Sequence, residues 1–473
     1  MRRTVAGASV ILLALAGYVA LDVQDQVPGV LTRDAPTAPL VTPSSPTSSP
    51  TVPLPSAPSS VASVAPAPLA GAPTATGLAA ALAASLADPW LGPSVGVTIG
   101  DAQGRVLLAR SQDTPRTPAS TAKLLTAAAV ASTLSETDTM TTRVVQGSSP
   151  EEVVLVAGGD TMLAPGAGRP GAVEGRAGLD DLADQVSAAL AGRTRVRLAL
   201  DLSYAAGPQY APGWNPADVS AGYTQGVSMI GLAGRRPTPG HPSPTDPPAA
   251  VAAAFRTALA TRGVTATLTP RSTWSQAAPA GAATLGEVRS APTADVLALA
   301  LDDSDNALTE NLARQAAVRA GRGSSFAEAA DWVHETTAGL GIDLTGATLT
   351  DACGLTSGQR LPVRVLGELL ALAVSGSQPV FRDVVTQLPV AGVDGSLHDR
   401  FRTGTAHAAA GIARAKTGTL TGTSGLAGTL VDRDGQLLTY AIVADRVPTA
   451  TGTLGARAAL DRFVATLAGC GCR

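Results

Sequence analysis

The hydrophobic pattern of the chain predicts a buried helix in its first third. An apolar, alanine-rich run extends from Leu124 to Leu134, and its length and composition are typical of a helix packed inside a core. Pro118 suits the first turn of such a helix. Ser120 is therefore expected close to the helix N-terminus, with Lys123 one turn further along the same face.

Alternating apolar and polar positions predict strands near both ends of the folded part. The predicted hairpins pair 94–100 with 105–110, and 424–431 with 436–445 across a turn at 432–435. A further strand is predicted at 416–419, and helical patterns cover 79–86 and 454–468. The N- and C-terminal pieces are expected to build one antiparallel sheet with helices on both sides. This is an α/β (α+β) fold whose main domain is made of residues 77–141 and 291–473.

Residues 142–290 interrupt that domain. They mix short apolar runs with Gly- and Pro-rich loops, and they predict an inserted domain of short strands.

The N-terminal segment has the pattern of an export signal. Two arginines after Met1 precede an apolar stretch, so residues 1–31 are expected to be a signal peptide or a membrane anchor, with cleavage and retention both open. Residues 32–76 are rich in Pro, Ser, Thr and Ala with almost no charge, which is typical of a linker. We therefore expect an exported, extracytoplasmic protein of the cell envelope.

Only two lysines occur in the chain, Lys123 and Lys416, although Lys and Arg together number 34. Arginine stays charged at ordinary pH, whereas a buried lysine can lose its proton. The two positions that keep lysine are therefore the first places to look for chemistry.

Lys123 is the last residue of a Ser-x-x-Lys motif that begins at Ser120. A serine hydroxyl is a weak nucleophile that needs an adjacent base. A desolvated, neutral lysine can accept that proton, and a helix N-terminus favours negative charge on a substrate oxygen.

Two further motifs complete the set. Ser304 and Asn306, in Ser-Asp-Asn, are suited to moving a proton to a leaving amine and to holding a substrate amide. Lys416, Thr417 and Gly418 lie on a predicted strand, where the first two can bind a carboxylate and the glycine lets a substrate backbone approach. Each motif alone is weak evidence. The three motifs occur in the expected order and contain both lysines of the chain, so a chance match does not explain them.

Other segments carry a resemblance to one family. The chain from about Leu78 onward resembles the D-alanyl-D-alanine carboxypeptidase/endopeptidase family, the type-4 low-molecular-mass penicillin-binding proteins (peptidase family S13). The matching segments are Gly158-Gly-Asp-Thr-Met-Leu163, Pro212-Gly-Trp214, Asp351-Ala-Cys-Gly-Leu355 and Leu388-Pro-Val-Ala-Gly-Val-Asp-Gly-Ser-Leu397. The resemblance implies a penicillin-recognising, β-lactamase-like domain split by an insert.

The resemblance also implies roles for the motif residues. Ser120 would be acylated, Lys123 would be its base, and Lys416 and Thr417 would bind the terminal D-Ala carboxylate. The backbone N–H groups of Ser120 and Thr419 would form the oxyanion hole. The family holds the free amino end of the peptide stem with an acidic residue of the insert, and Asp201 is the candidate here. The implied partners are peptidoglycan stem peptides and β-lactams.

Cysteines and charge restrict the remaining possibilities. Cys470 and Cys472 lie too close together for an easy mutual bridge. In an oxidising compartment one of them could pair with Cys353, which stands where the family has a small hydroxyl residue, and the pairing stays open. The net charge of −3 without a basic stripe argues against a nucleic-acid partner. No histidine or cysteine spacing predicts a metal site or a cofactor.

Two alternative functions stay open. A β-lactamase would use the same three motifs, although no Glu-x-x-Leu-Asn segment for a deacylating water is present. A catalytically silent wall-binding or muropeptide-sensing protein would be expected to lack a motif residue, and none is missing. Carboxypeptidase versus endopeptidase preference and oligomeric state cannot be predicted from these patterns.

Overall fold

A computed structural model describes residues 71–135, 137–449 and 452–473. The predicted export segment and most of the predicted linker lie outside these residues. No helix among the described residues has both the length and the apolar character needed to cross a membrane.

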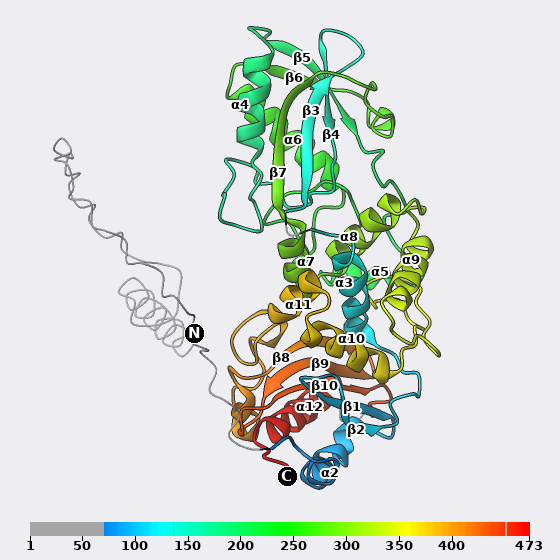
Figure 1. The fold of residues 1–473 in the computed structure, drawn as a ribbon. Coiled ribbons are helices and arrows are strands. Elements are labelled where there is room, and N and C mark those ends of the chain that lie inside the picture. The colour runs from blue at the N-terminus through cyan, green and yellow to red at the C-terminus, as the bar shows by residue number, and fades with distance from the viewer. Residues whose placement is uncertain (1–70, 136, 450–451) are drawn as a thin grey trace, which may run out of the picture. The chain divides into compact units, whose positions relative to one another are not determined.

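The first sheet joins the two ends of the described chain (Figure 1). Its antiparallel strands run in the order β2-β1-β10-β9-β8, with bounds Val106–Arg110, Val95–Asp101, Leu437–Ala444, Thr423–Val431 and Arg414–Leu420. Val95 is paired with Ala444, so β1 lies directly beside a strand that follows it by more than three hundred residues. Both predicted hairpins are confirmed.

Alternation along β10 explains why helices cover both faces of this sheet. Tyr440 and Ile442 belong to a core shared with α2 (Ala75–Leu86) and α12 (Gly452–Ala468). Ala441 and Val443 point the other way, into a core shared with α10 (Val363–Ser375). Successive strand residues face opposite sides, and burial of both sets requires a layer of helix on each side (Figure 1). The predicted fold class is confirmed.

The second sheet occupies the interrupting segment. Its order is β6-β5-β4-β3-β7, with bounds Thr265–Leu268, Arg195–Asp201, Glu152–Val156, Thr139–Gln146 and Thr284–Pro292. The β4–β5 and β5–β6 pairs are parallel and the others antiparallel. The sheet thus covers nearly the same range as the predicted insert, whose status as a separate domain stays a prediction.

Helices in this segment are a difference from the sequence expectation. Helices α4 (Leu179–Ala189) and α6 (Pro247–Ala260) pack on the second sheet, where only strands and loops were expected. Parallel strands need long crossover connections, which are usually helical, and this explains both helices. Asp246 caps α6 by accepting a hydrogen bond from the Ala249 backbone.

The remaining helices lie before, within or after the second sheet in the chain order. They are α3 (Lys123–Ala131), α5 (Pro216–Ser220), α7 (Thr293–Asp302), α8 (Asn306–Arg319), α9 (Phe326–Gly339) and α11 (Pro379–Thr386). Short 3-10 turns are η1 (Pro89–Leu91), η2 (Ala119–Ala122), η3 (Arg271–Thr273), η4 (Gly395–Leu397) and η5 (Gly404–Ala409). Helices α3, α7, α8, α9 and α10 share one apolar core.

The expectation that Cys470 and Cys472 would not easily bridge each other was wrong. Cys470 and Cys472 pair with each other, with their Cα atoms 5.1 Å apart, and Cys353 is a buried free thiol. A positive φ of 32° at Cys472 folds the chain back enough to bring the two side chains together. Their Cα separation lies within the usual disulfide range, which spacing in the sequence alone did not suggest.

Candidate active site

The nucleophile candidate lies in a tight turn immediately before a buried helix. Ser120 is in the 3-10 turn η2, and α3 begins only at Lys123, so the serine precedes the α-helix rather than starting it. Ala119 has a φ of 47°, which turns the chain sharply into η2. The Lys123 Nζ atom lies 2.9 Å from Ser120 Oγ, as the i, i+3 spacing predicted.

Lys123 is fully buried and has three oxygen neighbours. Besides Ser120 Oγ, its Nζ atom donates to Asn306 Oδ1 at 2.5 Å and to the Cys353 backbone oxygen at 2.8 Å. The amide and carbonyl oxygens can only accept, so they use two N–H bonds. A neutral amine has only two N–H bonds, and its lone pair is then directed at the Ser120 hydroxyl. This geometry suits proton acceptance from Ser120.

The second motif is held in an unusual backbone conformation. Ser304 has a φ of 56°, in the left-handed region that residues other than glycine seldom adopt. Asp305 caps α8, because its Oδ1 accepts a hydrogen bond from the Leu308 backbone at 2.9 Å. Asn306 bridges two parts of the chain, with Oδ1 on Lys123 and Nδ2 donating to the Tyr223 backbone oxygen at 2.8 Å.

The third motif lies on β8, at the edge of the first sheet. Lys416 Nζ donates to Ser304 Oγ at 2.8 Å, and Thr417 Oγ1 donates to Ser396 Oγ at 3.0 Å. A Cβ atom at Gly418 would lie 2.8 Å from the Pro118 backbone oxygen, so only glycine lets β8 approach the nucleophile turn this closely. An edge strand leaves backbone groups available to an extended peptide.

Burial changes the acid–base properties of both lysines. Desolvation lowers the pKa of Lys123, because burial penalises its charged form. Desolvation also lowers the pKa of Lys416 well below its ordinary value, and Lys123, when it is protonated, lowers it further. A lowered pKa favours the neutral amine, which is the form of lysine that can accept a proton.

The segment from Asp351 to Gln359 supports the nucleophile turn from behind. The Asp351 carboxylate accepts hydrogen bonds from the Gly354 and Thr356 backbone N–H groups, both at 2.7 Å, and from the side chains of Gln359 and Trp214 at 2.7 and 3.0 Å. This network fixes the loop whose Cys353 carbonyl oxygen accepts from Lys123.

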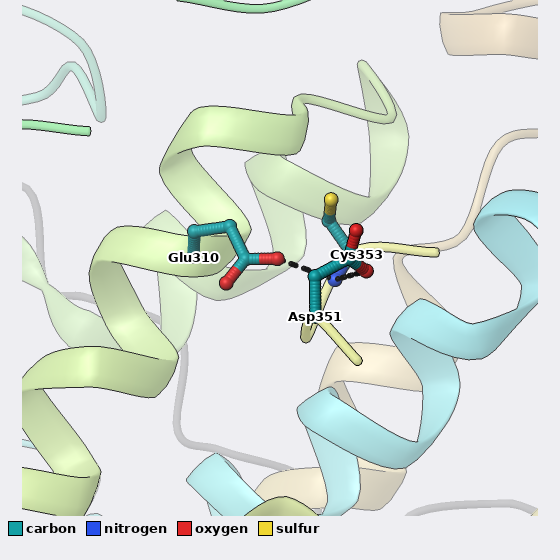
Figure 2. Close-up of side chains that lie close together, drawn as sticks. All are labelled: Glu310, Asp351 and Cys353. Atoms are coloured by element: carbon teal, nitrogen blue, oxygen red, sulfur yellow. Dashed lines mark hydrogen bonds between the residues drawn. The ribbon is translucent and has the colours of Figure 1, made fainter. Parts of the chain in front are cut away.

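Glu310, Asp351 and Cys353 form a buried cluster with ligand-type atoms within 4.8 Å of one another (Figure 2). Glu310 Oε1 already accepts from the Ala352 and Cys353 backbone N–H groups, both at 2.8 Å. A cation would face these N–H donors and would have to displace them. Desolvation raises the pKa of Glu310 to about 8, which favours a neutral carboxyl rather than an ion ligand.

Two acidic residues of the inserted segment, Asp201 and Asp218, differ in their hydrogen bonds. The buried carboxylate of Asp201 accepts from the Ser203 backbone and hydroxyl at 2.9 and 2.6 Å and from the Ala278 backbone at 2.8 Å. The carboxylate of Asp218, on α5, makes no hydrogen bond or ion pair with any described residue. The Asp218 backbone oxygen accepts from Tyr223, whose own carbonyl binds Asn306.

The structure therefore brings together the five residues predicted to be catalytic. Hydrogen bonds connect Ser120, Lys123 and Asn306 in one chain, and Ser304 with Lys416 in a second, and Thr417 and Gly418 are on the same strand as Lys416. Asp201 is not joined to either chain by a hydrogen bond.

The sequence did not single out three other contributors. Ser396 lies within the Leu388–Leu397 segment that resembled the family, so its partnership with Thr417 had a sequence signal. Tyr223 acts through its backbone oxygen, which no side-chain pattern reveals. Glu310 sits one turn along α8 from Asn306, within a run that looked like ordinary helix.

This fold and this pairing of serine and lysine are those expected of the penicillin-recognising serine hydrolases. A model of the D-Ala-D-Ala carboxypeptidase 3 (S13) family matches residues 78–236 and 232–467. The chain is 38% identical over 406 residues to Carboxypeptidase DacB of Mycolicibacterium smegmatis, covering 85% of each protein. It is 36% identical over 409 residues to Carboxypeptidase Rv3627c of Mycobacterium tuberculosis, covering 85% of this chain and 86% of that one.

A solved structure has the same fold. Penicillin binding protein 4 (dacB) from Haemophilus influenzae superposes with a TM-score of 0.64 at 17% identity, covering 82% of this chain and 98% of that chain. The chain belongs to the D-Ala-D-Ala carboxypeptidase (S13) family, and the resemblance inferred from its motifs is confirmed.

Proposed function

We propose that this protein is a serine-type D-Ala-D-Ala carboxypeptidase or endopeptidase that acts on peptidoglycan stem peptides. The observation that carries the proposal is the buried Lys123 side chain, whose Nζ atom lies 2.9 Å from Ser120 Oγ and also contacts the Asn306 Oδ1 and Cys353 backbone oxygens. When Lys123 is neutral, those two oxygens use both of its N–H bonds and leave its lone pair for the Ser120 proton. Family membership and the carboxypeptidase names of the relatives support the same reaction class.

Acylation follows from this geometry. Ser120 Oγ attacks the carbonyl carbon of the penultimate residue while Lys123 takes the hydroxyl proton. The N–H groups of Ser120 and Thr419 are proposed to stabilise the oxyanion. When the C–N bond breaks, the leaving amine takes a proton through Ser304, whose Oγ lies 2.8 Å from Lys416 Nζ.

Substrate contacts are proposed around β8. Lys416 and Thr417 would bind the terminal carboxylate, and Gly418 would let the peptide backbone lie along the edge strand. Water then hydrolyses the Ser120 ester, which frees the enzyme and the shortened stem. A β-lactam would acylate Ser120 in the same way through its strained amide.

Two residues of the insert are candidates for binding the free amino end of the peptide stem. Asp201 is the residue expected from the sequence, but an ammonium group would have to compete with three hydrogen bonds for its carboxylate. Asp218 has an unengaged carboxylate among the described residues, on the segment that leads to Tyr223 at the site. We propose Asp218 as the stronger of the two candidates.

We propose that the enzyme acts in the cell envelope, on the basis of its sequence and its family. A stem-peptide substrate lies outside the cytoplasmic membrane, and the predicted export segment is consistent with that place. Anchoring by the same segment stays a prediction.

The test is to locate the acyl group. The exported protein without residues 1–76 is incubated with a fluorescent penicillin and then mapped by peptide mass spectrometry. One adduct at Ser120 is expected, with none in Ser120→Ala. An adduct on another serine, or folded protein with no adduct, would refute the mechanism.

The β-lactamase alternative is separated by turnover of nitrocefin. A single stoichiometric burst followed by slow release is expected for a peptidase. Sustained rapid turnover would favour the β-lactamase instead.

A further inference from the structure

Arg236 connects the inserted segment to the second motif. Its guanidinium Nη1 lies 3.0 Å from Asp305 Oδ2, and Nη2 lies 2.7 Å from Asp303 Oδ2 and 3.1 Å from Glu174 Oε2. The Arg236 side chain is only 12% exposed, and Asp305 is 3% exposed. Partial burial makes these charge-assisted bonds stronger than ordinary surface ion pairs.

The two aspartates that Arg236 binds flank Ser304 on either side. Ser304 is held at a φ of 56°, which costs free energy and persists only where the surroundings enforce it. One planar guanidinium that binds both neighbours fixes the distance between them. It therefore restrains the turn that presents the Ser304 hydroxyl to Lys416.

Other contacts complete the restraint. Asp305 also caps α8 through its other oxygen, so Arg236 and the helix hold the same carboxylate from two sides. Gly395, at a φ of 49°, lies so close to Asp302 that any Cβ there would clash with its carboxylate. The inserted segment makes a second contact with the motif through the Tyr223 carbonyl on Asn306.

We propose that Arg236 is a positioning residue, through which the inserted segment sets the geometry of Ser304 for proton transfer to the leaving group. The inference rests on the proposed function. It departs from the expectation that residues 142–290 set substrate choice rather than bond cleavage, because it gives them a part in bond cleavage as well.

The charges around the turn support the same role. Glu174, Asp303 and Asp305 share the single positive charge of Arg236. Asp302 lies beside them, and desolvation together with the charges of Asp303 and Asp394 raises its pKa to about 6. Without Arg236 these carboxylates would repel one another across Ser304, and the turn would be expected to open.

The experiment measures acylation by a fluorescent penicillin over a range of concentrations, which separates the limiting rate from the half-saturating concentration. Arg236→Ala is expected to lower the limiting rate at least about tenfold, with the half-saturating concentration changed by no more than about twofold. Arg236→Lys should have a higher limiting rate than Arg236→Ala but a lower one than the unchanged enzyme. Its ammonium group keeps the positive charge but cannot bind both aspartates in the planar geometry of a guanidinium.

Arg262→Ala is the matched control. Arg262 also belongs to the inserted segment and pairs with Asp180 and Asp184, both within that segment. Its loss is expected to leave the acylation rate unchanged. An equal loss in both variants would show a general effect of weakening the insert and would overturn the proposal.

A second variant keeps the test decisive if Arg236→Ala does not fold. Asp303→Asn removes one arm of the contact at a side chain that is 39% exposed, and it is expected to lower the limiting rate about threefold or more. A wild-type rate in folded Arg236→Ala, or in Asp303→Asn if the first is unfolded, refutes the inference. Failure of the unchanged enzyme to be acylated at Ser120 would instead refute the proposed function.

Discussion

At the scale of single residues, the two lysines have different surroundings and are expected to respond differently to substitution. Lys123 is enclosed by Ser120, Asn306 and the Cys353 carbonyl, and its lone pair is needed as a proton acceptor. Lys416 contacts Ser304 and its neighbour's carbonyl, and its proposed part is to bind a carboxylate.

Lys123→Arg is expected to reduce acylation by a fluorescent penicillin on the order of 100-fold or more, because a guanidinium cannot accept a proton. Lys416→Arg keeps a positive charge and is expected to cost about tenfold. The acylation rate of the unchanged enzyme should fall as pH drops through the lowered pKa of Lys123, since protonation removes the acceptor.

Thermal unfolding of both variants is the control for folding, because each larger head must fit a fully buried position. The assigned roles would be contradicted if folded Lys416→Arg were the more damaged of the two.

At the scale of elements, the loop from Asp351 to Gln359 decides where the nucleophile turn lies. Gly354 has a φ of 83°, and a Cβ there would lie 2.1 Å from the Ala119 backbone oxygen, next to Ser120. Gly358 has a φ of 88°, but nothing lies within 4 Å of its Cβ position. The two glycines share a left-handed backbone conformation, but only Gly354 is in close contact with the nucleophile turn.

Gly354→Ala is expected to destabilise the protein by about 3 kcal/mol and to slow acylation strongly, because the clash pushes on the residue before Ser120. Gly358→Ala should cost about 1 kcal/mol, from backbone strain alone, without slowing acylation. Urea unfolding and penicillin acylation are measured for both. Equal effects on acylation would mean that the close contact at Gly354 does not position the nucleophile.

The same loop is tied to helix α8 by Glu310, whose pKa is raised to about 8 by burial and by the charge of Asp351. In the unfolded chain this carboxyl loses its proton near 4.5, whereas the folded protein retains it to about pH 8. The folded state therefore binds more protons between these values, and stability is expected to fall as pH rises through that window.

Glu310→Gln keeps an oxygen for the Ala352 and Cys353 N–H groups but cannot ionise. Relative to this variant, the unchanged protein is expected to lose about 2–4 kcal/mol of unfolding free energy between pH 5 and pH 8. Urea unfolding of both proteins across that range measures the difference. Parallel stability curves would show that Glu310 is ionised in the fold.

At the scale of the whole molecule, the inserted segment and the first sheet meet at the second motif. Tyr223 and Arg236 from the insert contact Asn306, Asp303 and Asp305. These contacts connect the proposed substrate recognition by the insert to the proposed bond cleavage at the motif residues, and substitutions in the insert can be sorted by which of the two they change.

Asp218→Asn is expected to raise the Michaelis constant about tenfold for stem peptides with a free amino end, equivalent to roughly 1.4 kcal/mol, because it removes an unengaged carboxylate. Penicillin acylation, which lacks that contact, should change little. Peptide hydrolysis and penicillin acylation are compared for each variant.

Asp201→Asn is the paired variant. It disturbs the hydrogen bonds to Ser203 and Ala278, so a loss of stability with both activities lowered together is expected. A selective rise in the Michaelis constant in Asp201→Asn, with none in Asp218→Asn, would restore Asp201 as the residue that holds the amino end.

The sequence by itself determined much of this protein, because some of its signals are local. The Ser-x-x-Lys spacing places two side chains within one turn, and the alternation in the C-terminal hairpin fixes which residues face each layer of helix. The scarcity of lysine pointed to Lys123 and Lys416 without any structure. The helices α4 and α6 were missed. In α4 the buried residues Leu179, Leu182, Ala183 and Val186 follow helical spacing, so the sequence carried a signal that was overlooked. In α6 the apolar face is built largely from alanine, and the need for both helices arises from the parallel strands that they connect.

Only the tertiary structure decided features that depend on contacts between distant segments. Tyr223, Arg236 and Glu310 lie in sequence segments that show no motif of their own. Their contacts with the site, through the Tyr223 carbonyl on Asn306, the Arg236 ion pairs with Asp303 and Asp305, and the burial of Glu310, therefore appear only in the fold. The pairing of Cys470 with Cys472 depends on one backbone angle, and the engagement of Asp201 depends on a loop far along the chain. Local spacing determines which side chains share a turn, whereas burial and long-range hydrogen bonding determine which of them are free to act.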